Sequence, residues 1–278
     1  MDGARQRLRT IYPDNEALWM VREIFHHLKG YSLADLMLKA EDEVSDYISG
    51  KVTAITDRLL AHEPLQYILG EARFYGMTFE VTPATLIPRP ETEELTDLIV
   101  KRWNKTDDLR VLDLCTGSGC IAIALARNLP FSQVTALDIS GDALAVARKN
   151  AANLKTKVSF IEDDVLSLSP KPASYDIIVS NPPYVLDSER KDMDKVVLDH
   201  EPHTALFVPD NDPLRFYRPI IAYAAIALRP GGMAYLEINP LEADSLTALC
   251  DKSVWSDVSL EKDISGRNRF MILTRGAE

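Results

Sequence analysis

Four consecutive residues near the middle of the chain have the types needed to hold an amino group. Asn181 is followed by Pro182, Pro183 and Tyr184, directly after the apolar run DIIVS. Each proline fixes its own φ and restricts the residue before it, which holds Asn181 in an extended conformation. The Asn181 side-chain oxygen and the Pro182 carbonyl are two acceptors for the two N–H donors of a planar NH2 group. Tyr184 supplies a flat face for stacking, so Asn181, Pro182 and Tyr184 are predicted catalytic residues.

A second constellation, RVLDLCTGSGCIAIALA at 110–126, is typical of a strand, a tight turn and a helix. Gly117 and Gly119 allow the backbone to bend and to approach a ligand closely. Asp138 follows at the end of QVTALD. An acidic residue about 20 residues after the glycine turn can accept hydrogen bonds from both hydroxyls of a ribose. The pattern predicts a nucleoside pocket.

Two cofactors are compatible with this pocket. Gly117, Gly119 and Ala122 also satisfy the dinucleotide fingerprint, so that an NAD enzyme is the alternative. Asp113, however, is expected inside the turn, where its charge repels a pyrophosphate and attracts a cation. The sequence also offers no evident acid or base for hydride transfer. S-adenosylmethionine, which carries a sulfonium and an ammonium and no phosphate, is favoured.

Composition limits the classes of protein that remain. The 278 residues are 46% hydrophobic, which suffices for one large core and a smaller one. A net charge of −11 argues against broad binding to nucleic-acid phosphates. No apolar run approaches the ~20 residues of a membrane span, and the first 15 residues do not resemble a secretory signal. The three cysteines lack metal-ligand spacing and suit a reducing compartment. Together with the absence of an apolar run of sufficient length, this leads us to expect no metal, no membrane association and a cytoplasmic location.

The chain is expected to have three parts. Residues 1–72 predict a helical domain, with helices starting at Asp14 and Ser32, a third apolar stripe from 44 to 60, and a short helix from Pro64 to Gly70. Residues 73–90 predict a hairpin and a stiff Pro-rich linker. Residues 91–278 predict a catalytic domain of the α/β class. Its helices are expected near 92–103, 119–129, 140–153, 213–228 and 240–251, between strands at 109–114, 133–138, 157–161, 175–180, 233–238, 254–260 and 268–274.

This alternation indicates a mainly parallel sheet covered on both faces, with an antiparallel hairpin at the end because no helix separates the last two strands. Ligands of such sheets bind outside the carboxyl ends of the strands, near the point where strand order reverses. Functional residues are therefore expected in the loops after the first, second and fourth strands.

The tetrapeptide at 181–184 resembles the signature shared by adenine-N6 DNA methyltransferases and protein-glutamine-N5 methyltransferases. Four further segments resemble the HemK/PrmC family of peptide-chain release factor glutamine methyltransferases, namely EPLQYILGEARFYGMTFEV at 63–81, TLIPRPETEEL at 85–95, EPHTALF at 201–207 and DISGRNRF at 263–270. Ribosomal-protein glutamine methyltransferases, which usually carry a Pro-Arg-Ser version, are the first alternative. DNA methyltransferases need a basic target-recognition region, and no segment here is long or basic enough. A methyltransferase-like binding module without activity is the non-enzymatic alternative.

The resemblance implies a Rossmann-like class I S-adenosylmethionine-dependent methyltransferase fold with a seven-stranded sheet and an N-terminal helical bundle. It implies transfer of a methyl group to the glutamine of a Gly-Gly-Gln motif in release factors, which act in translation termination, with S-adenosylhomocysteine as product. We expect a monomer that makes no direct contact with nucleic acid.

The resemblance also implies residue roles. The ribose of the donor would contact Asp138, and its adenine would contact Asp164 and Val165. Its methionine part would contact the turn formed by Cys115, Thr116, Gly117, Ser118 and Gly119. The substrate would contact Asn181, Pro182, Pro183 and Tyr184. A loop with Arg89, Pro90 and Glu91 would close over the donor, although Arg89 also fits a structural ion pair. Two positions depart from the family, Cys115 where glycine is frequent and Val165 where some relatives have an aromatic residue.

Overall fold

The computed structural model describes residues 2–39 and 43–277, and these divide into two compact units. The first unit comprises Met1–Glu71 together with Asp194–His200, and the second comprises Ala72–Met193 together with Glu201–Glu278. Within the described residues, no helix has both the length and the apolar character needed to cross a membrane.

The first unit is helical, as predicted. Its helices are α1 (Asp2–Leu8), α2 (Asp14–Lys29), α3 (Leu33–Leu38), α4 (Asp46–Leu60), α5 (Leu65–Leu69) and α9 (Lys195–His200). Ser32 caps α3 in a capping box with Asp35, and Gly30 ends α2 in the left-handed conformation. Pro13, rather than Asp14, is the N-cap of α2. Helix α1 was not predicted, because Leu8 is its one buried residue and it has no apolar stripe.

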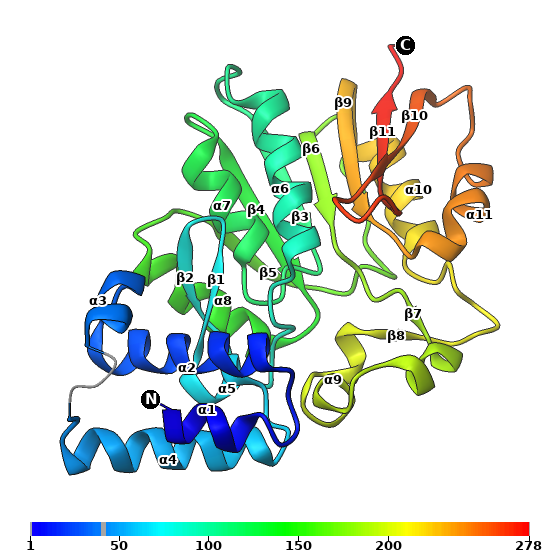
Figure 1. The fold of residues 1–278 in the computed structure, drawn as a ribbon. Coiled ribbons are helices and arrows are strands. Elements are labelled where there is room, and N and C mark those ends of the chain that lie inside the picture. The colour runs from blue at the N-terminus through cyan, green and yellow to red at the C-terminus, as the bar shows by residue number, and fades with distance from the viewer. Residues whose placement is uncertain (1, 40–42, 278) are drawn as a thin grey trace. The chain divides into compact units, whose positions relative to one another are not determined.

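The second unit is built on a seven-stranded sheet, which confirms the predicted α/β fold (Figure 1). The strands are β3 (Arg110–Leu114), β4 (Gln133–Asp138), β5 (Ser159–Glu162), β6 (Tyr175–Ser180), β9 (Leu228–Glu237), β10 (Trp255–Lys262) and β11 (Asn268–Arg275). Their order is β10-β11-β9-β6-β3-β4-β5. Strand β11 is antiparallel to β10 and β9, and the other pairs are parallel.

Helices cover both faces of this sheet. Alternate strand residues such as Val111 and Ile177 share one core with α6 (Pro90–Trp103), α7 (Cys120–Asn128) and part of α8 (Gly141–Asn153). Their neighbours Leu112 and Ile178 share the other core with α10 (Tyr217–Ala227) and α11 (Ala243–Ala248). Because side chains alternate along a strand, each apolar strand supplies both cores.

Short elements complete the second unit. The predicted hairpin is present as β1 (Glu71–Phe74) and β2 (Met77–Glu80). Three 3₁₀ turns, η1 (Asp187–Asp192), η2 (His203–Ala205) and η3 (Pro240–Glu242), and the two-residue strands β7 (Val185–Leu186) and β8 (Phe207–Val208) were not predicted. Strand β9 starts five residues earlier than predicted, where it pairs irregularly with the start of β6.

The register of four parallel strands aligns their carboxyl ends. Leu114 pairs with Leu137 of β4 on one side and with Ser180 of β6 on the other, and Ser180 pairs with Leu236 of β9. The next residue of each strand therefore lies in one row at the edge of the sheet. Across the sheet, this edge row reads Asp138, Cys115, Asn181 and Glu237. Strand order reverses between β3 and β6, which is where such sheets bind ligands.

The turn between β3 and α7 depends on glycine in two different ways. Gly117 and Gly119 both have positive φ, +54° and +79°, which side chains adopt at a cost. A Cβ on Gly117 would meet nothing within 4 Å. A Cβ on Gly119 would lie 3.1 Å from the Ala147 Cβ of α8 and 3.2 Å from Ile123 Cδ1. Gly119 therefore permits α7 and α8 to pack closely.

We expect Gly119→Ala to destabilise the protein more than Gly117→Ala. Both variants carry the strain of a positive φ, about 1–2 kcal/mol. Gly119→Ala adds an overpacking cost of about 1–3 kcal/mol. Urea unfolding followed by circular dichroism measures both free energies. Equal losses in the two variants would contradict the packing role of Gly119.

Candidate active site

A cavity of about 420 Å³ lies at the carboxyl edge of the sheet, a size typical of small-molecule sites. It is lined by residues of the second unit that follow β3, β4, β5 and β6, and by parts of 84–92 and 202–216. Of the residues predicted from sequence, those that line it are Arg89, Cys115, Thr116, Gly117, Ser118, Asp138, Asp164, Val165, Asn181 and Pro183. Those placed outside its described lining are Pro90, Glu91, Gly119, Pro182 and Tyr184.

Cys115 occupies the first position of the turn in a conformation that usually selects glycine. Its φ is +62° although it carries a side chain, and this left-handed conformation favours glycine. Burial raises the pKa of the Cys115 thiol well above its ordinary value, and the nearby Asp138 carboxylate adds to this shift. The thiol therefore stays protonated at neutral pH and is unsuited to nucleophilic chemistry.

Asp113 does not face the cavity, and its expected role in attracting a cationic ligand was wrong. Its side chain is fully buried beneath the turn. Asp113 Oδ2 accepts hydrogen bonds from Thr116 Oγ1 at 2.6 Å and from the Ala122 N–H at 3.2 Å. Asp113 Oδ1 finds no partner within the part of the chain that the structure describes. Burial raises the pKa of this carboxyl to about 7. The two hydrogen bonds of Asp113 tie the turn to the start of α7.

Asp138 lies on the cavity wall, where two backbone N–H groups fix its carboxylate. Its Oδ2 accepts the Gly117 N–H at 2.8 Å, and its Oδ1 accepts the Ser140 N–H at 2.9 Å. Burial raises its pKa, and these two hydrogen bonds act in the opposite direction. Each carboxylate oxygen has a further lone pair, so the fixed carboxylate can accept two hydroxyl protons.

The loops after β4 and β5 form an apolar part of the cavity. Val165 is buried, and Asp164 Oδ1 accepts the Leu166 N–H at 2.9 Å, which shapes this loop. Ile139 is 65% exposed although it lines the cavity, and the sequence analysis did not identify it. The available signal was an apolar residue directly after the acidic strand end. Ile139 and Val165 give this wall the character of a site for a flat ring.

Asn181 lies on the cavity wall with one side of its carboxamide occupied. Its Nδ2 donates to Thr92 Oγ1 at 3.0 Å, and Thr92 Oγ1 donates to Glu237 Oε2 at 2.7 Å. The Tyr184 hydroxyl donates to Glu237 Oε1 at 2.9 Å. Neither Thr92 nor Glu237 was identified from the sequence, because they are brought to Asn181 by α6 and β9, 89 and 56 residues away in the chain.

Arg89 forms the ion pair that was one of its two predicted roles. Its Nη2 lies 2.6 Å from Glu201 Oε1, and the Glu201 side chain is 1% exposed. The Ile87 N–H donates to Glu201 Oε2 at 3.2 Å. Both carboxylate oxygens are thus used to join 87–89 to the start of 201–207. The ion pair fixes two segments of the cavity wall.

The charges of the cavity fit a cation better than a pyrophosphate. Asp138, Asp163 and Asp164 place three carboxyl groups on the wall, against two arginines, Arg215 and Arg89, of which Arg89 is paired with Glu201. Two solved structures share the fold. A methyltransferase from Pyrococcus furiosus matches 81% of this chain and 100% of its own, with TM-score 0.55 and 17% identity. The Thermus thermophilus 16S rRNA N2 G1207 methyltransferase matches 75% of this chain and 50% of its own, with TM-score 0.52 and 21% identity. The fold is that of class I S-adenosylmethionine-dependent methyltransferases.

Family models and sequence relatives are more specific. Residues 1–70 match the PrmC N-terminal domain, and residues 89–200 match the methyltransferase small domain. A release factor glutamine methyltransferase of Bacteroides thetaiotaomicron is 46% identical, over 98% of this chain and 97% of its own length. That of Flavobacterium psychrophilum is 42% identical, over 96% and 94%. The chain belongs to the release factor glutamine methyltransferase family.

We expect the buried Asp113 to make stability depend on pH. Its folded pKa of about 7 lies above the ordinary 3.8, so the folded state holds the proton more tightly than the unfolded state. The resulting stability is fully present below pH 3.8 and is lost as pH rises to about 7. Each pKa unit corresponds to about 1.4 kcal/mol.

The measurement is urea unfolding of wild type and Asp113→Asn between pH 4 and pH 8, with Asp244→Asn, at an exposed site on α11, as control. Because the introduced amide does not ionise, the Asp113→Asn variant should gain stability relative to wild type, by roughly 1–4 kcal/mol, as pH rises. A difference that stays constant with pH would show that Asp113 is ionised throughout.

Proposed function

We propose that this protein transfers a methyl group from S-adenosylmethionine to the side-chain amide nitrogen of the glutamine in the Gly-Gly-Gln motif of peptide-chain release factors. The observation that carries the proposal is the Asn181 carboxamide, which lies on the cavity wall with its nitrogen bound to Thr92 and its oxygen turned to the other side. The names of the relatives, which are release factor glutamine methyltransferases, support the same substrate.

The donor is held by residues that follow three strands. Cys115 to Gly119 contact its methionine part, Asp138 accepts hydrogen bonds from its ribose, and Asp164 and Val165 flank its adenine. When bound, S-adenosylmethionine supplies a methyl carbon activated by a sulfonium. The three wall carboxylates, Asp138, Asp163 and Asp164, favour this cationic ligand over NAD.

The substrate carboxamide is held by Asn181 and Pro182. The Asn181 side-chain oxygen and the Pro182 carbonyl accept its two N–H groups, which fixes the plane of the amide. An amide nitrogen is a poor nucleophile, and orientation can contribute up to about 7–11 kcal/mol to such a reaction. The two hydrogen bonds strengthen as the nitrogen gains positive charge, so they stabilise the transition state more than the bound substrate.

Neighbouring residues support this arrangement. Pro183 lines the cavity beside Asn181, and the Tyr184 ring stacks on the substrate amide while its hydroxyl donates to Glu237. The segment with Arg89, Pro90 and Glu91 covers the donor; Arg89 lies in the loop before α6 and lines the cavity, while Pro90 and Glu91 belong to the first turn of α6. Its Arg89–Glu201 ion pair supports a fixed loop position, and the helix α6 begins at Pro90.

The remaining parts of the proposal concern the whole protein. Residues 1–72 dock the release factor, 73–90 connect, and 91–278 carry out the transfer. The match of residues 1–70 to the PrmC N-terminal domain supports a family-specific role for the first part. The protein acts as a monomer in the cytoplasm, binds no nucleic acid directly and uses no metal.

The activity is tested on purified release factor incubated with the enzyme and S-adenosylmethionine. We expect the intact mass to rise by one methyl substitution, and peptide mapping to place it on the glutamine of the Gly-Gly-Gln motif. A release factor with this glutamine changed to alanine is the control. Methylation of a ribosomal protein or of adenine in nucleic acid, without methylation of release factor, would overturn the proposed substrate.

We expect Asn181→Ala to abolish most of the activity without preventing donor binding. Loss of a fixed acceptor in the transition state should lower kcat by about a hundredfold or more. The affinity for S-adenosylmethionine, measured by calorimetry, should stay within about threefold, a change below 1 kcal/mol. Asn153→Ala, at the exposed end of α8, is the control. Full turnover by Asn181→Ala would remove Asn181 from the mechanism.

A further inference from the structure

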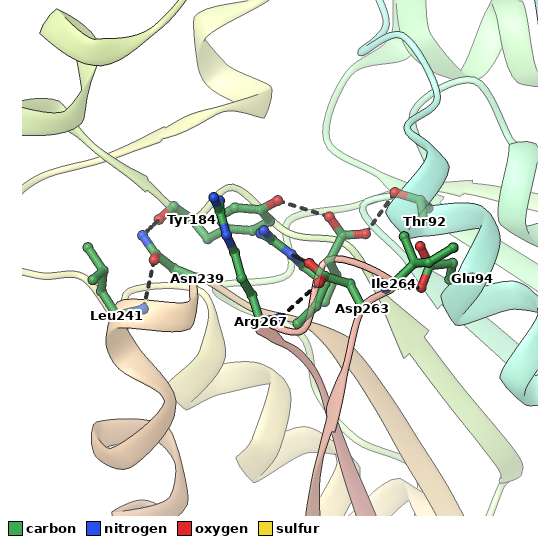
Figure 2. Close-up of polar contacts among 10 residues, drawn as sticks. Thr92, Glu94, Tyr184, Asn239, Leu241, Asp263, Ile264 and Arg267 are labelled. Carbon is green, nitrogen blue, oxygen red and sulfur yellow. Dashed lines mark hydrogen bonds and ion pairs between the residues drawn. The ribbon is translucent and has the colours of Figure 1, made fainter.

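A buried carboxylate lies next to the proposed substrate site and accepts two hydroxyl protons. Glu237, the last residue of β9, is 1% exposed. Its Oε2 accepts from Thr92 Oγ1 at 2.7 Å and its Oε1 from the Tyr184 hydroxyl at 2.9 Å. Figure 2 shows Thr92 of α6 and Tyr184, with dashed lines that mark the hydrogen bonds of both hydroxyls. One hydroxyl is that of Thr92, whose oxygen lies 3.0 Å from Asn181 Nδ2, and the other is that of Tyr184, which follows Asn181 by three residues in the chain.

The environment of Glu237 contains groups of both signs. Burial raises the pKa of its carboxyl, while the two hydroxyl donors and the positive charge of Arg269 act in the opposite direction. The Arg269 side chain is 13% exposed and also pairs with Asp263, at 3.2 Å. Glu91 adds a negative charge that disfavours ionisation of Glu237. Each of the two Glu237 carboxyl oxygens meets one hydroxyl, an arrangement that suits the ionised carboxylate, which accepts hydrogen bonds and donates none.

This property determines the direction of every hydrogen bond between Glu237 and Asn181. A threonine hydroxyl has one proton, and Thr92 gives it to Glu237. The Thr92 oxygen can therefore only accept on its other side, where Asn181 lies 3.0 Å away. The NH2 group of Asn181 must face Thr92, because its carbonyl oxygen would meet a second acceptor there. The orientation of the Asn181 amide therefore follows from the hydrogen bonds that link it through Thr92 to Glu237.

We propose that Thr92 and Glu237 are positioning residues that keep the Asn181 oxygen directed at the substrate. The inference rests on the proposed function, because that function requires an acceptor at this atom. In the flipped amide, the Asn181 NH2 group would face the NH2 group of the substrate, and one of the two hydrogen bonds that fix the substrate plane would be lost. Glu237 lies outside the described lining of the cavity, and Thr92, which is part of that lining, acts through its hydrogen bond to Asn181.

The chain offers a matched comparison one helical turn further along α6. Thr96 is fully buried, like Thr92, and its hydroxyl donates to the Thr92 carbonyl at 3.0 Å. Replacement of either threonine by valine removes one hydroxyl from a buried site of α6. The two variants share the cost of a lost buried hydrogen bond, about 0.5–1.5 kcal/mol. They differ in whether the lost hydroxyl is bonded to Asn181.

The first test is kinetic and uses the full-length enzyme with release factor and S-adenosylmethionine. Thr92→Val should lower kcat by about tenfold or more, which is the loss of one oriented hydrogen bond, and leave donor affinity within about twofold. Thr92→Ser keeps the hydroxyl and should recover most of kcat, while Thr96→Val should resemble wild type. Unaltered kcat in Thr92→Val, or a Thr92→Ser variant as impaired as Thr92→Val, would overturn the proposal.

The role of Glu237 is tested by Glu237→Gln, alone and with Thr92→Val. A glutamine amide at 237 can donate to the Thr92 oxygen, which releases the hydroxyl proton toward Asn181 and permits the flipped orientation. The single variant should lower kcat as Thr92→Val does. The double variant should fall little further than the weaker single variant, because residues of one network are not additive. Fully additive losses would show that Glu237 acts independently of Thr92.

A second measurement does not depend on turnover. The side-chain NH2 of Asn181, assigned by NMR through its loss in Asn181→Ala, should exchange with solvent about tenfold faster in Thr92→Val than in wild type or Thr96→Val. If exchange is faster in Thr92→Val than in wild type but the wild-type enzyme does not methylate release factor, the proposed substrate is rejected and the positioning role stands. Unchanged exchange in Thr92→Val would overturn the positioning role whatever the activity.

Discussion

The site depends on the alignment of parallel strands. Hydrogen bonds between β4, β3, β6 and β9 bring four strand ends to the same level, and the next residue of each strand forms the edge row. This row contains an acidic residue, a turn residue in the left-handed conformation, an amide and a buried carboxylate, in that order. A slip of one residue would turn each of them to the opposite face of the sheet. The backbone ladder therefore fixes the chemistry as well as the fold.

Buried acidic groups support the loops that form the cavity. Asp113 ties the glycine turn to α7, Glu201 holds the segment before α6, and Glu237 accepts the hydroxyls of Thr92 and Tyr184. Each is 4% exposed or less, and burial of a carboxyl group is costly unless its oxygens are bonded. The protein thus gives up some stability for fixed positions at one edge of the sheet.

Much of the fold could be predicted from the sequence because its signals are local. The strand and helix alternation, the glycine turn and Asn181 are contiguous patterns, and the seven-stranded sheet is confirmed. The role of Asp113 was misread, because its depth depends on which face of β3 is buried. Thr92 and Glu237 were missed, since a threonine in a first helical turn and a glutamate at a strand end are each ordinary. Only tertiary packing brings them to Asn181.

The pairing of Arg89 with Glu201 affects how the cavity can open. Residues 112 positions apart are joined by a charged contact, so the stretch between them behaves as a loop closed by a non-covalent crosslink. Separation of the pair would leave the almost fully buried Glu201 carboxylate without its cation, which typically costs about 3–5 kcal/mol. Small molecules are thus expected to enter and leave while these two segments move together. This wall of the cavity is therefore expected to stay rigid, and local opening motions are expected in other parts of the entrance.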